Sequence, residues 1–218
     1  STDRTVELAE KAWATKVQHI HISPWRFDLA RNAALAMVPK DIDICVSLDL
    51  DEELQPGWRE EIERVWSYGT TRLRYKFDWG VGIVFYYEKI HGRNGYKWHH
   101  PCHEYPVPDR LQERWARTDM LLVVHKPDPT KSRGQYLDLL RVSVEEDPQD
   151  PRNAFYYARE LSFNARWHDA ITECKRYLEL PGATWDGERC YAMRVISRSY
   201  QALGDTQGAL NWARRATA

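Results

Sequence analysis

Cysteine and methionine are scarce in this chain, and neither sign of charge is in excess. Its 218 residues include 4 cysteines and 3 methionines, and 31 lysines and arginines nearly balance 32 aspartates and glutamates. The cysteines are far apart and form no C-x-x-C pair, which argues against a zinc cluster and gives little support to a disulfide framework. We therefore expect a reduced, intracellular protein, located in the cytoplasm.

Long apolar runs and a basic surplus are missing as well. No apolar run approaches the roughly 20 residues that span a bilayer, and no signal peptide is visible, so we expect no membrane span. Without a basic excess, binding to duplex DNA through phosphate neutralisation is disfavoured. Aromatic residues, in contrast, are plentiful, with 10 tryptophans and 12 tyrosines. This composition predicts a folded globule rather than a disordered chain.

The first 130 residues alternate between helical and strand-like patterns. Helical spacing occurs at 5–14, 26–38 and 56–69, and strand-like patterns occur at 16–22, 43–50, 70–79, 82–90 and 119–129. Such alternation predicts an α/β domain with a mostly parallel sheet, mixed at its edge and flanked by helices.

From about residue 133 the pattern is helical throughout. We expect helices at 133–146, 152–165, 168–180, 187–203 and 206–217. Segment 154–180 can be laid over 193–218 at an offset of 39 residues, and small residues recur where two helices must approach closely. This pattern resembles the tetratricopeptide repeat, whose period is about 34 residues. The chain is therefore divided into an α/β domain at 1–130 and an all-α, tetratricopeptide-like domain at 131–218, with a generic helical bundle as the alternative for the second.

Carboxylates cluster where the apolar strand 43–50 ends. The segment "VSLDLDEEL" places Asp49, Asp51, Glu52 and Glu53 within five positions. Like charges repel, so a compensating cation is expected beside them. Two aspartates two residues apart at a strand end suit Mg²⁺ or Mn²⁺ shared with a diphosphate. Taken by itself, the motif is more typical of a solvated acidic turn than of a metal site.

Five segments occur in a characteristic order along the chain. They are "STDRT" (1–5), "FDLARNAAL" (27–35), "VSLDLDEEL" (46–54), "HHPCHEYPV" (99–107) and "LLVVHKPDP" (121–129). This succession resembles the family 2-type glycosyltransferases of the GT-A fold, in the branch that often carries tetratricopeptide-like helices after the catalytic domain. The resemblance implies metal-dependent transfer of a sugar from a nucleoside-diphosphate sugar to a hydroxyl or thiol acceptor. The acceptor is left open among a glycan, a peptide or protein, and a modified base in DNA.

The same resemblance implies roles for individual residues. The D-x-D pair and His125 would hold a Mn²⁺ or Mg²⁺ ion. Glu104 would act as the base that deprotonates the acceptor, and Glu52 is the second choice for that base. The alternatives are a polar strand end for His125, a surface ion pair for Arg31, and an aromatic loop that only packs on itself. The implied sets are Asp3, Arg31 and Asp49 for the donor nucleotide, Asp49, Asp51 and His125 for the metal, and Trp98, His103 and Tyr105 for the acceptor.

One departure from the family pattern and two rival interpretations accompany this hypothesis. The pattern usually begins earlier, with a strand and a base-reading aspartate, so we expect that the chain lacks its natural N-terminus and first strand. The first rival is a non-catalytic scaffold, whose repeat helices would bind a protein partner or a second copy of the chain. The second is a metal-dependent phosphoryl-transfer or hydrolytic enzyme, which is disfavoured because neither a P-loop nor an H-E-x-x-H motif is present.

Overall fold

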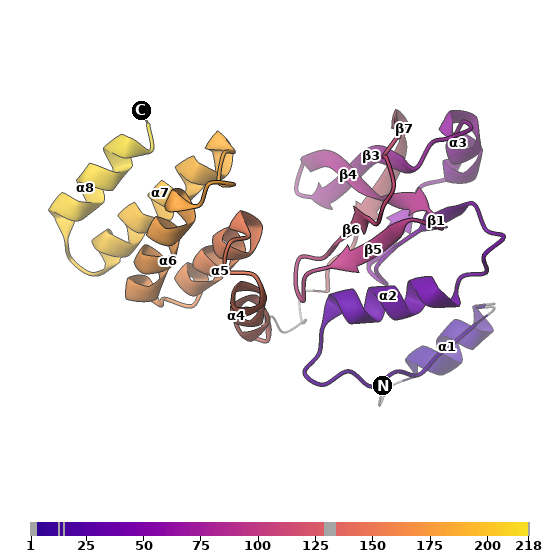
Figure 1. The fold of residues 1–218 in the computed structure, drawn as a ribbon, viewed down its shortest axis with the longest axis horizontal. Coiled ribbons are helices and arrows are strands. Elements are labelled where there is room, and N and C mark those ends of the chain that lie inside the picture. The colour runs from indigo at the N-terminus through magenta and orange to yellow at the C-terminus, as the bar shows by residue number, and fades with distance from the viewer. Residues whose placement is uncertain (1–3, 13, 15, 129–133, 218) are drawn as a thin grey trace. The chain divides into compact units, whose positions relative to one another are not determined.

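The computed structural model describes residues 4–12, 14, 16–128 and 134–217. The chain divides into two compact units (Figure 1). The sheet unit comprises Ser1–His99 and Glu104–Lys131, and the helical unit comprises His100–His103 and Ser132–Ala218. Within the described residues, we find no helix with the length and apolar character needed to cross a membrane.

The described residues of the sheet unit form three helices and two sheets. Its helices are α1 (Thr5–Lys11), α2 (Phe27–Met37) and α3 (Trp58–Val65). The five-stranded sheet consists of β1 (Ile44–Val46), β2 (Glu52–Leu54), β3 (Arg72–Gly80), β4 (Ile83–Gly92) and β7 (Trp115–His125). The two-stranded sheet pairs β5 (Tyr96–His99) with β6 (Tyr105–Pro108).

The five-stranded sheet is mixed, with the order β1-β4-β3-β7-β2. Only β3 and β7 run parallel among its described pairings, so the expectation of a mostly parallel sheet is wrong. Parallel neighbours need a long crossover, which segment 81–114 supplies between β3 and β7. β3 and β4, in contrast, are joined only by Val81 and Gly82, and such a short connection forces an antiparallel hairpin.

One further expected strand is absent, and three observed strands were not expected. Residues 16–22 form no strand, because no neighbouring strand is paired with them in the described part of the chain, and Val17 and Ile20 stay 38% and 41% exposed. Period-two alternation produces a strand only where an edge is available for pairing. Conversely, β2, β5 and β6 were not predicted, since strands of three or four residues carry too little pattern to recognise.

Strand alternation gives the five-stranded sheet one buried face and one polar face. The buried face packs against Ile62 of α3. On the other face, the Arg74 Nε donates to Glu88 at 2.8 Å and Tyr86 donates to Asp119. The buried members of the core are Ile62, Leu73, Tyr75, Phe77, Ile90, Leu121 and Val123. This division follows from the period of two along a strand.

The described part of the helical unit forms five consecutive helices, whose bounds agree with the sequence expectations to within three residues, although residue 133, the expected start of the first, lies outside the described residues. They are α4 (Tyr136–Glu146), α5 (Pro151–Phe163), α6 (Trp167–Glu179), α7 (Asp186–Ala202) and α8 (Thr206–Arg215). Each packs on the next, and α5 also packs on α7. The start of α5 has a clear local cause, since the Asp150 side chain accepts from the Arg152 N–H at 2.7 Å and Pro151 occupies the first turn.

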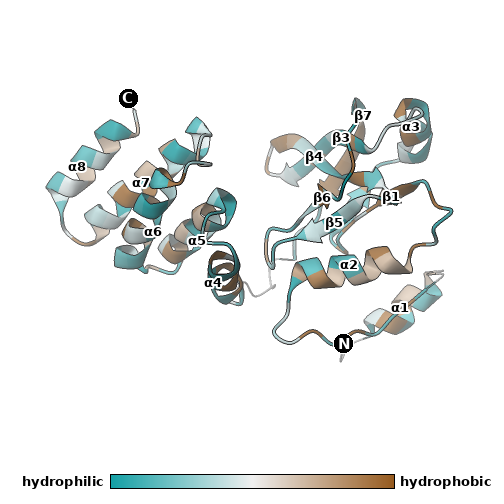
Figure 2. Ribbon diagram, in the orientation of Figure 1, coloured by the Kyte–Doolittle hydropathy of each residue, from teal (hydrophilic) through white to brown (hydrophobic). Residues whose placement is uncertain are grey.

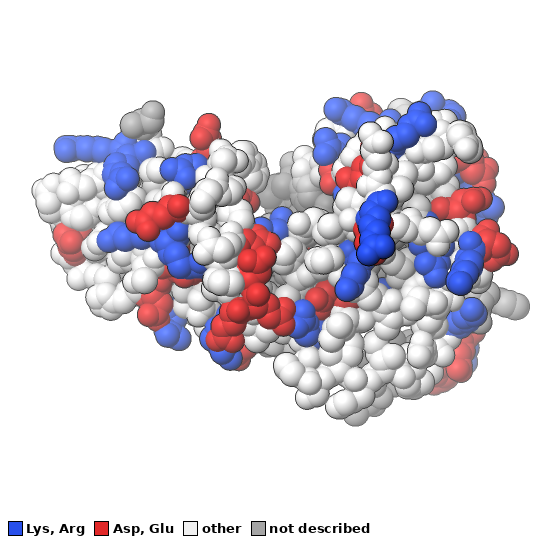
Figure 3. All heavy atoms as spheres, in the orientation of Figure 1, with Lys and Arg blue, Asp and Glu red and all other residues white. Residues whose placement is uncertain are grey.

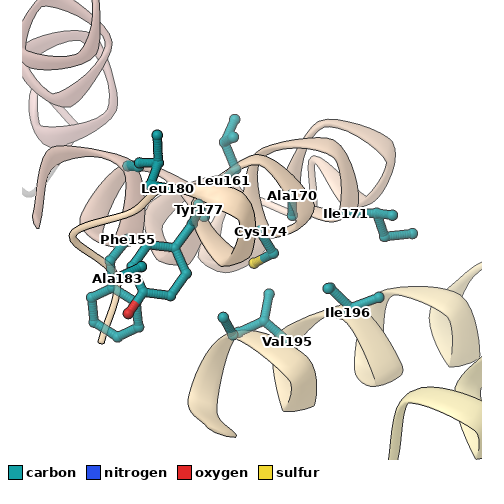
Figure 4. Close-up of a cluster of buried hydrophobic side chains, with 13 residues drawn as sticks. Phe155, Leu161, Ala170, Ile171, Cys174, Tyr177, Leu180, Ala183, Val195 and Ile196 are labelled. Carbon is teal, nitrogen blue, oxygen red and sulfur yellow. The ribbon is translucent and has the colours of Figure 1, made fainter. Parts of the chain in front are cut away.

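Small and large apolar residues alternate in the core of the helical unit. Ala154, Ala170 and Ala192 allow close helix contact, while Tyr177 and Ile196 fill the remaining space. Figure 4 shows Cys174 of α6 directed toward Val195 and Ile196 of α7, and the ring of Tyr177 beside Phe155 and Ala183. In Figure 2 hydrophilic and hydrophobic residues share each of these helices, as expected for amphipathic helices packed on one another.

Candidate functional site

The carboxylate of Asp49 lies between two cations that belong to the chain itself. Asp49 follows β1, and its Oδ2 accepts a hydrogen bond from the Lys89 Nζ of β4 at 2.9 Å. Its Oδ1 accepts from Arg31 of α2. The compensating cations expected beside the D-x-D pair are therefore, for Asp49, an arginine and a lysine.

The side chain of Glu52 is buried more deeply than that of Asp49. Its Oε1 accepts from the Lys89 Nζ at 2.8 Å, and its Oε2 accepts from the backbone N–H of Asp49 at 2.9 Å. The side chains of Glu52 and Lys89 are only 4% and 6% exposed. Because both oxygens of Glu52 are bound and the side chain is buried, Glu52 fixes the turn that carries Asp49.

Arg31 connects Asp49 with the second predicted motif. Its Nε donates to Glu104 Oε1 at 3.1 Å, across 73 positions of sequence. The guanidinium carbon lies 5.1 Å from the ring centroid of Trp98, within the range of a cation–π contact. The backbone of Trp98 is held by Asn32. Its backbone N–H donates to Asn32 Oδ1 at 2.9 Å, and its backbone carbonyl accepts from Asn32 Nδ2 at 2.8 Å.

We call the connected set of charged residues the Arg31–Lys89 network. Its members are Arg31, Asp49, Glu52, Lys89 and Glu104. With three carboxylates and two permanent cations, the network has an excess of one negative charge when all its members are ionised. It lies within a molecule whose visible surface mixes both signs of charge (Figure 3).

The local environment holds Asp49 and Lys89 in their charged forms. Burial alone would raise the pKa of Asp49, but Lys89 and Arg31 together outweigh burial and lower it. For Lys89, burial would lower the pKa, whereas Tyr87, Asp49 and Glu52 raise it above its usual value. The pair is therefore ionised at neutral pH.

Asp51 and His125 form a second group at the same end of the sheet. The His125 Nε2 lies 3.5 Å from Asp51 Oδ2, and His125 is opposite Glu52 in the β2–β7 register. The Nδ1 of His125 is buried without a hydrogen-bond partner among the described residues. The imidazole ring stacks on Trp79, with ring centroids 4.4 Å apart and planes inclined by 30°.

The donor atoms at this end of the sheet suit a divalent cation that is shared with a ligand. In the described ranges, no three His, Cys, Asp or Glu side chains gather in a metal-binding arrangement. The structure brings Asp51 and His125 together, while the Asp49 carboxylate is taken by Arg31 and Lys89. One carboxylate and one imidazole fit Mn²⁺ better than Mg²⁺, whose ligands are oxygens, and the remaining ligands would be phosphate and water oxygens.

The residues expected to contact an acceptor do not form one set. Trp98 is 2% exposed, so its ring has no free face for a ligand, whereas Tyr105 is 39% exposed. His103 belongs to the helical unit, where its ring stacks on Tyr156 at a centroid distance of 4.0 Å. Asp3, expected near the nucleotide, lies outside the described residues.

Sequence reasoning missed two residues of the site. Lys89 lies in β4 where its register against β3 shifts, and it is buried with its Nζ 5.1 Å from the ring centroid of Tyr87. A lysine within an apolar strand, here in "YYEKI", is a signal that a buried carboxylate is nearby. Trp79 was missed because it continues an ordinary apolar alternation, and only the fold brings its ring to His125.

Comparisons with known proteins give no family for this chain. No family model matches it, and no curated protein matches it. Among the solved structures that match is one titled "MamA MSR-1 C2", with 25% sequence identity over 39% of this chain and a TM-score of 0.33. The chain covers 48% of the length of that structure, and so low a TM-score carries no argument about fold or function.

Proposed function

We propose that the chain is a metal-dependent glycosyltransferase with a GT-A-like sheet unit and a tetratricopeptide-like helical unit. It would transfer a sugar from a nucleoside-diphosphate sugar to a hydroxyl or thiol acceptor. The observation that carries the proposal is the double contact of Arg31, which joins Asp49 of the D-x-D motif to Glu104 of the His-Glu motif. Two segments that a transferase of this type needs at one site are thereby linked through one side chain.

The proposed donor side consists of Asp51, His125 and Asp49. Asp51 and His125 would hold the Mn²⁺ or Mg²⁺ ion, which supplies charge neutralisation to the diphosphate leaving group. Asp49 would face the donor ribose or sugar, kept in place and ionised by Arg31 and Lys89. In this arrangement Arg31 is a positioning residue, because its Nε and one terminal nitrogen already bind carboxylates.

The proposed acceptor base is Glu104. For an inverting reaction, its carboxylate takes the proton of the acceptor hydroxyl as that oxygen bonds to the anomeric carbon and the nucleoside diphosphate departs. Glu52, the second choice on sequence grounds, is disfavoured because both of its oxygens are bound and its side chain is 4% exposed. Glu104 keeps one carboxylate oxygen outside its contact with Arg31.

Donor binding tests the proposal directly. Calorimetry would use a panel of UDP-, GDP-, TDP- and CDP-sugars, with and without Mn²⁺, on the wild type, Asp51→Ala and the control Asp119→Ala. Asp119 lies on the opposite face of the sheet and is 57% exposed, so its loss should not change binding. We expect metal-dependent binding of one donor that Asp51→Ala alone abolishes. Binding of no donor under any condition would contradict the transferase and favour the scaffold, in which the repeat helices bind a protein.

A further inference from the structure

The β3–β4 hairpin carries apolar side chains past the edge of the core. Tyr75 and Phe77 are buried, but the next residue on the same face, Trp79, is 49% exposed. Ile83 and Phe85 of β4 are 51% and 39% exposed. We call Trp79, Ile83 and Phe85 the hairpin patch.

The hairpin patch is continuous with the candidate site. Trp79 stacks on His125, which in turn lies beside Asp51. The ring centroid of Phe85 lies 5.8 Å from that of Tyr87, and the Lys89 Nζ lies 5.1 Å from the centroid of Tyr87. The hairpin patch therefore adjoins the charged residues in two places. Trp79 leads to His125 and Asp51, and Phe85 leads through Tyr87 to Lys89.

Nothing in the described part of the chain covers the tip of this hairpin. A side chain added at Gly80 or Gly82 would meet no atom within 4 Å. Exposed large apolar residues gathered beside polar ones are typical of a binding surface rather than of a core, because their exposure to water is unfavourable. The hairpin patch therefore presents an open aromatic surface next to a carboxylate and an imidazole.

A pyranose ring matches this combination chemically. One face of such a ring carries C–H groups, which pack on the face of an indole, and its rim carries hydroxyls, which hydrogen-bond to carboxylates. The outer edge of β4 over residues 83–88 has no paired strand in the described part of the chain, so a peptide that adds a strand there is the alternative outcome of the test. None of the three residues of the hairpin patch carries a positive charge, so the patch is poorly suited to bind a phosphate group.

We propose that Trp79, supported by Ile83 and Phe85, binds a pyranose ring of a glycan acceptor by stacking. This inference rests on the proposed function, because it assigns the acceptor of that same site. Trp79 is then a substrate-binding residue, and Trp98, buried at 2% exposure, takes no part in acceptor recognition.

Ligand-observed NMR tests this assignment without any need for turnover. The probes are methyl glycosides and β-linked disaccharides of glucose, galactose, mannose and N-acetylglucosamine, measured by saturation transfer on four proteins. The proteins are the wild type, Trp79→Ala, Trp79→Phe and the control Trp185→Ala, whose tryptophan is 68% exposed in the helical unit. We expect Trp79→Ala to weaken binding about tenfold, Trp79→Phe to restore part of the loss, and Trp185→Ala to match the wild type.

Donor calorimetry on the wild type and on Ile83→Ala separates this proposal from the proposed function. Ile83→Ala, a change in the hairpin patch that leaves the Trp79–His125 contact intact, should keep metal-dependent donor binding and weaken only glycan binding. Absence of glycan binding in the wild type, equal glycan binding in Trp79→Ala, or transfer to an unglycosylated peptide would each overturn the assignment of Trp79. Loss of donor binding in the wild type would instead contradict the transferase, while the NMR result on Trp79 would stand by itself.

Discussion

The two units of this chain differ in where their buried charges find partners, because Glu173 of the helical unit pairs with Arg176 in the same helix, whereas Lys89 of the sheet unit pairs with residues of other segments. The helical unit buries a continuous apolar cluster that includes Tyr177 and Ile196, both at 0% exposure. The sheet unit buries Lys89 at 5% exposure and leaves Trp79 half in water. Burying charge and exposing aromatic surface both cost free energy. The sheet unit buries Lys89 and exposes Trp79 near one strand end, and both features lower its stability at that place. Such a local loss of stability is typical of functional sites.

The same contrast appears in how contacts are made. In the helical unit, each helix packs mainly on its sequence neighbour. In the sheet unit, the Arg31–Lys89 network joins residues separated by 18 to 73 positions. Local apolar contacts specify the helical unit, whereas the site depends on strand and helix placement. Four changes test how far this contrast holds, from the largest expected effect to the smallest.

Glu104→Gln should give the largest effect on function with little effect on stability. If Glu104 is the acceptor base, the turnover number falls by about 100- to 10,000-fold, because the amide cannot take the proton. Arg31 can still donate to the amide oxygen, so the fold is kept. Steady-state kinetics with a saturating donor measure the loss, and Glu53→Gln, which alters an exposed ion pair with Lys126, is the matched control. Near-normal turnover in a folded Glu104→Gln variant would remove Glu104 from its role.

Lys89→Met should give the largest loss of stability in the sheet unit. The change leaves buried Glu52 and partly buried Asp49 without their shared cation, and breaking a buried pair in this way costs about 3–5 kcal/mol. Urea unfolding followed by hydrogen exchange in β3 and β4 measures the loss. Adding Glu52→Gln should recover part of it.

Lys126→Met is the control for that experiment. Its pair with Glu53 is exposed, with side-chain exposures of 65% and 54%. The free energy of unfolding of Lys126→Met should therefore stay within about 0.5 kcal/mol of that of the wild type. Equal losses for Lys89→Met and Lys126→Met would mean that the buried network does not stabilise the sheet unit.

Ile196→Ala should destabilise the helical unit by about 2–5 kcal/mol, because the side chain is fully buried and its removal leaves a cavity. Hydrogen exchange should accelerate in α5, α6 and α7 and stay unchanged in β3 and β7. Leu210→Ala, at a side chain that is 48% exposed, serves as the control and should cost less. Equal acceleration in both units would show that they unfold together, which would weaken the comparison.

Acid should act on the sheet unit through Asp49, with the smallest expected effect. The pKa of Asp49 is lowered from its usual 3.8 on folding. Its stabilising contribution is therefore present above about pH 4 and is lost as the pH falls through the lower folded value. Asp49→Asn should flatten the acid side of the stability profile, whereas Asp41→Asn, on an exposed loop, should not. An unchanged acid slope in Asp49→Asn would contradict this account.

The fold and the candidate site were predictable from the sequence to different degrees. The five helices of the helical unit were located because their apolar spacing and the Asp150-Pro151 start are local signals. The pairing of Asp51 with His125 was expected only through the family resemblance, and the structure brings the two side chains within 3.5 Å. The sheet direction and the strand expected at 16–22 were wrong, since both depend on which strand edges meet.

The sequence by itself determined the helical segments, the hairpin and the presence of clustered carboxylates, because periodicity and turn residues act over a few positions. Only the tertiary structure decided which groups lie beside those carboxylates, placing Arg31 and Lys89 at Asp49 and His125 at Asp51. It also decided that Trp98 is buried and that Trp79 is exposed beside His125. The physical reason is that charge compensation and burial are properties of neighbours in space, and these neighbours come from distant parts of the chain.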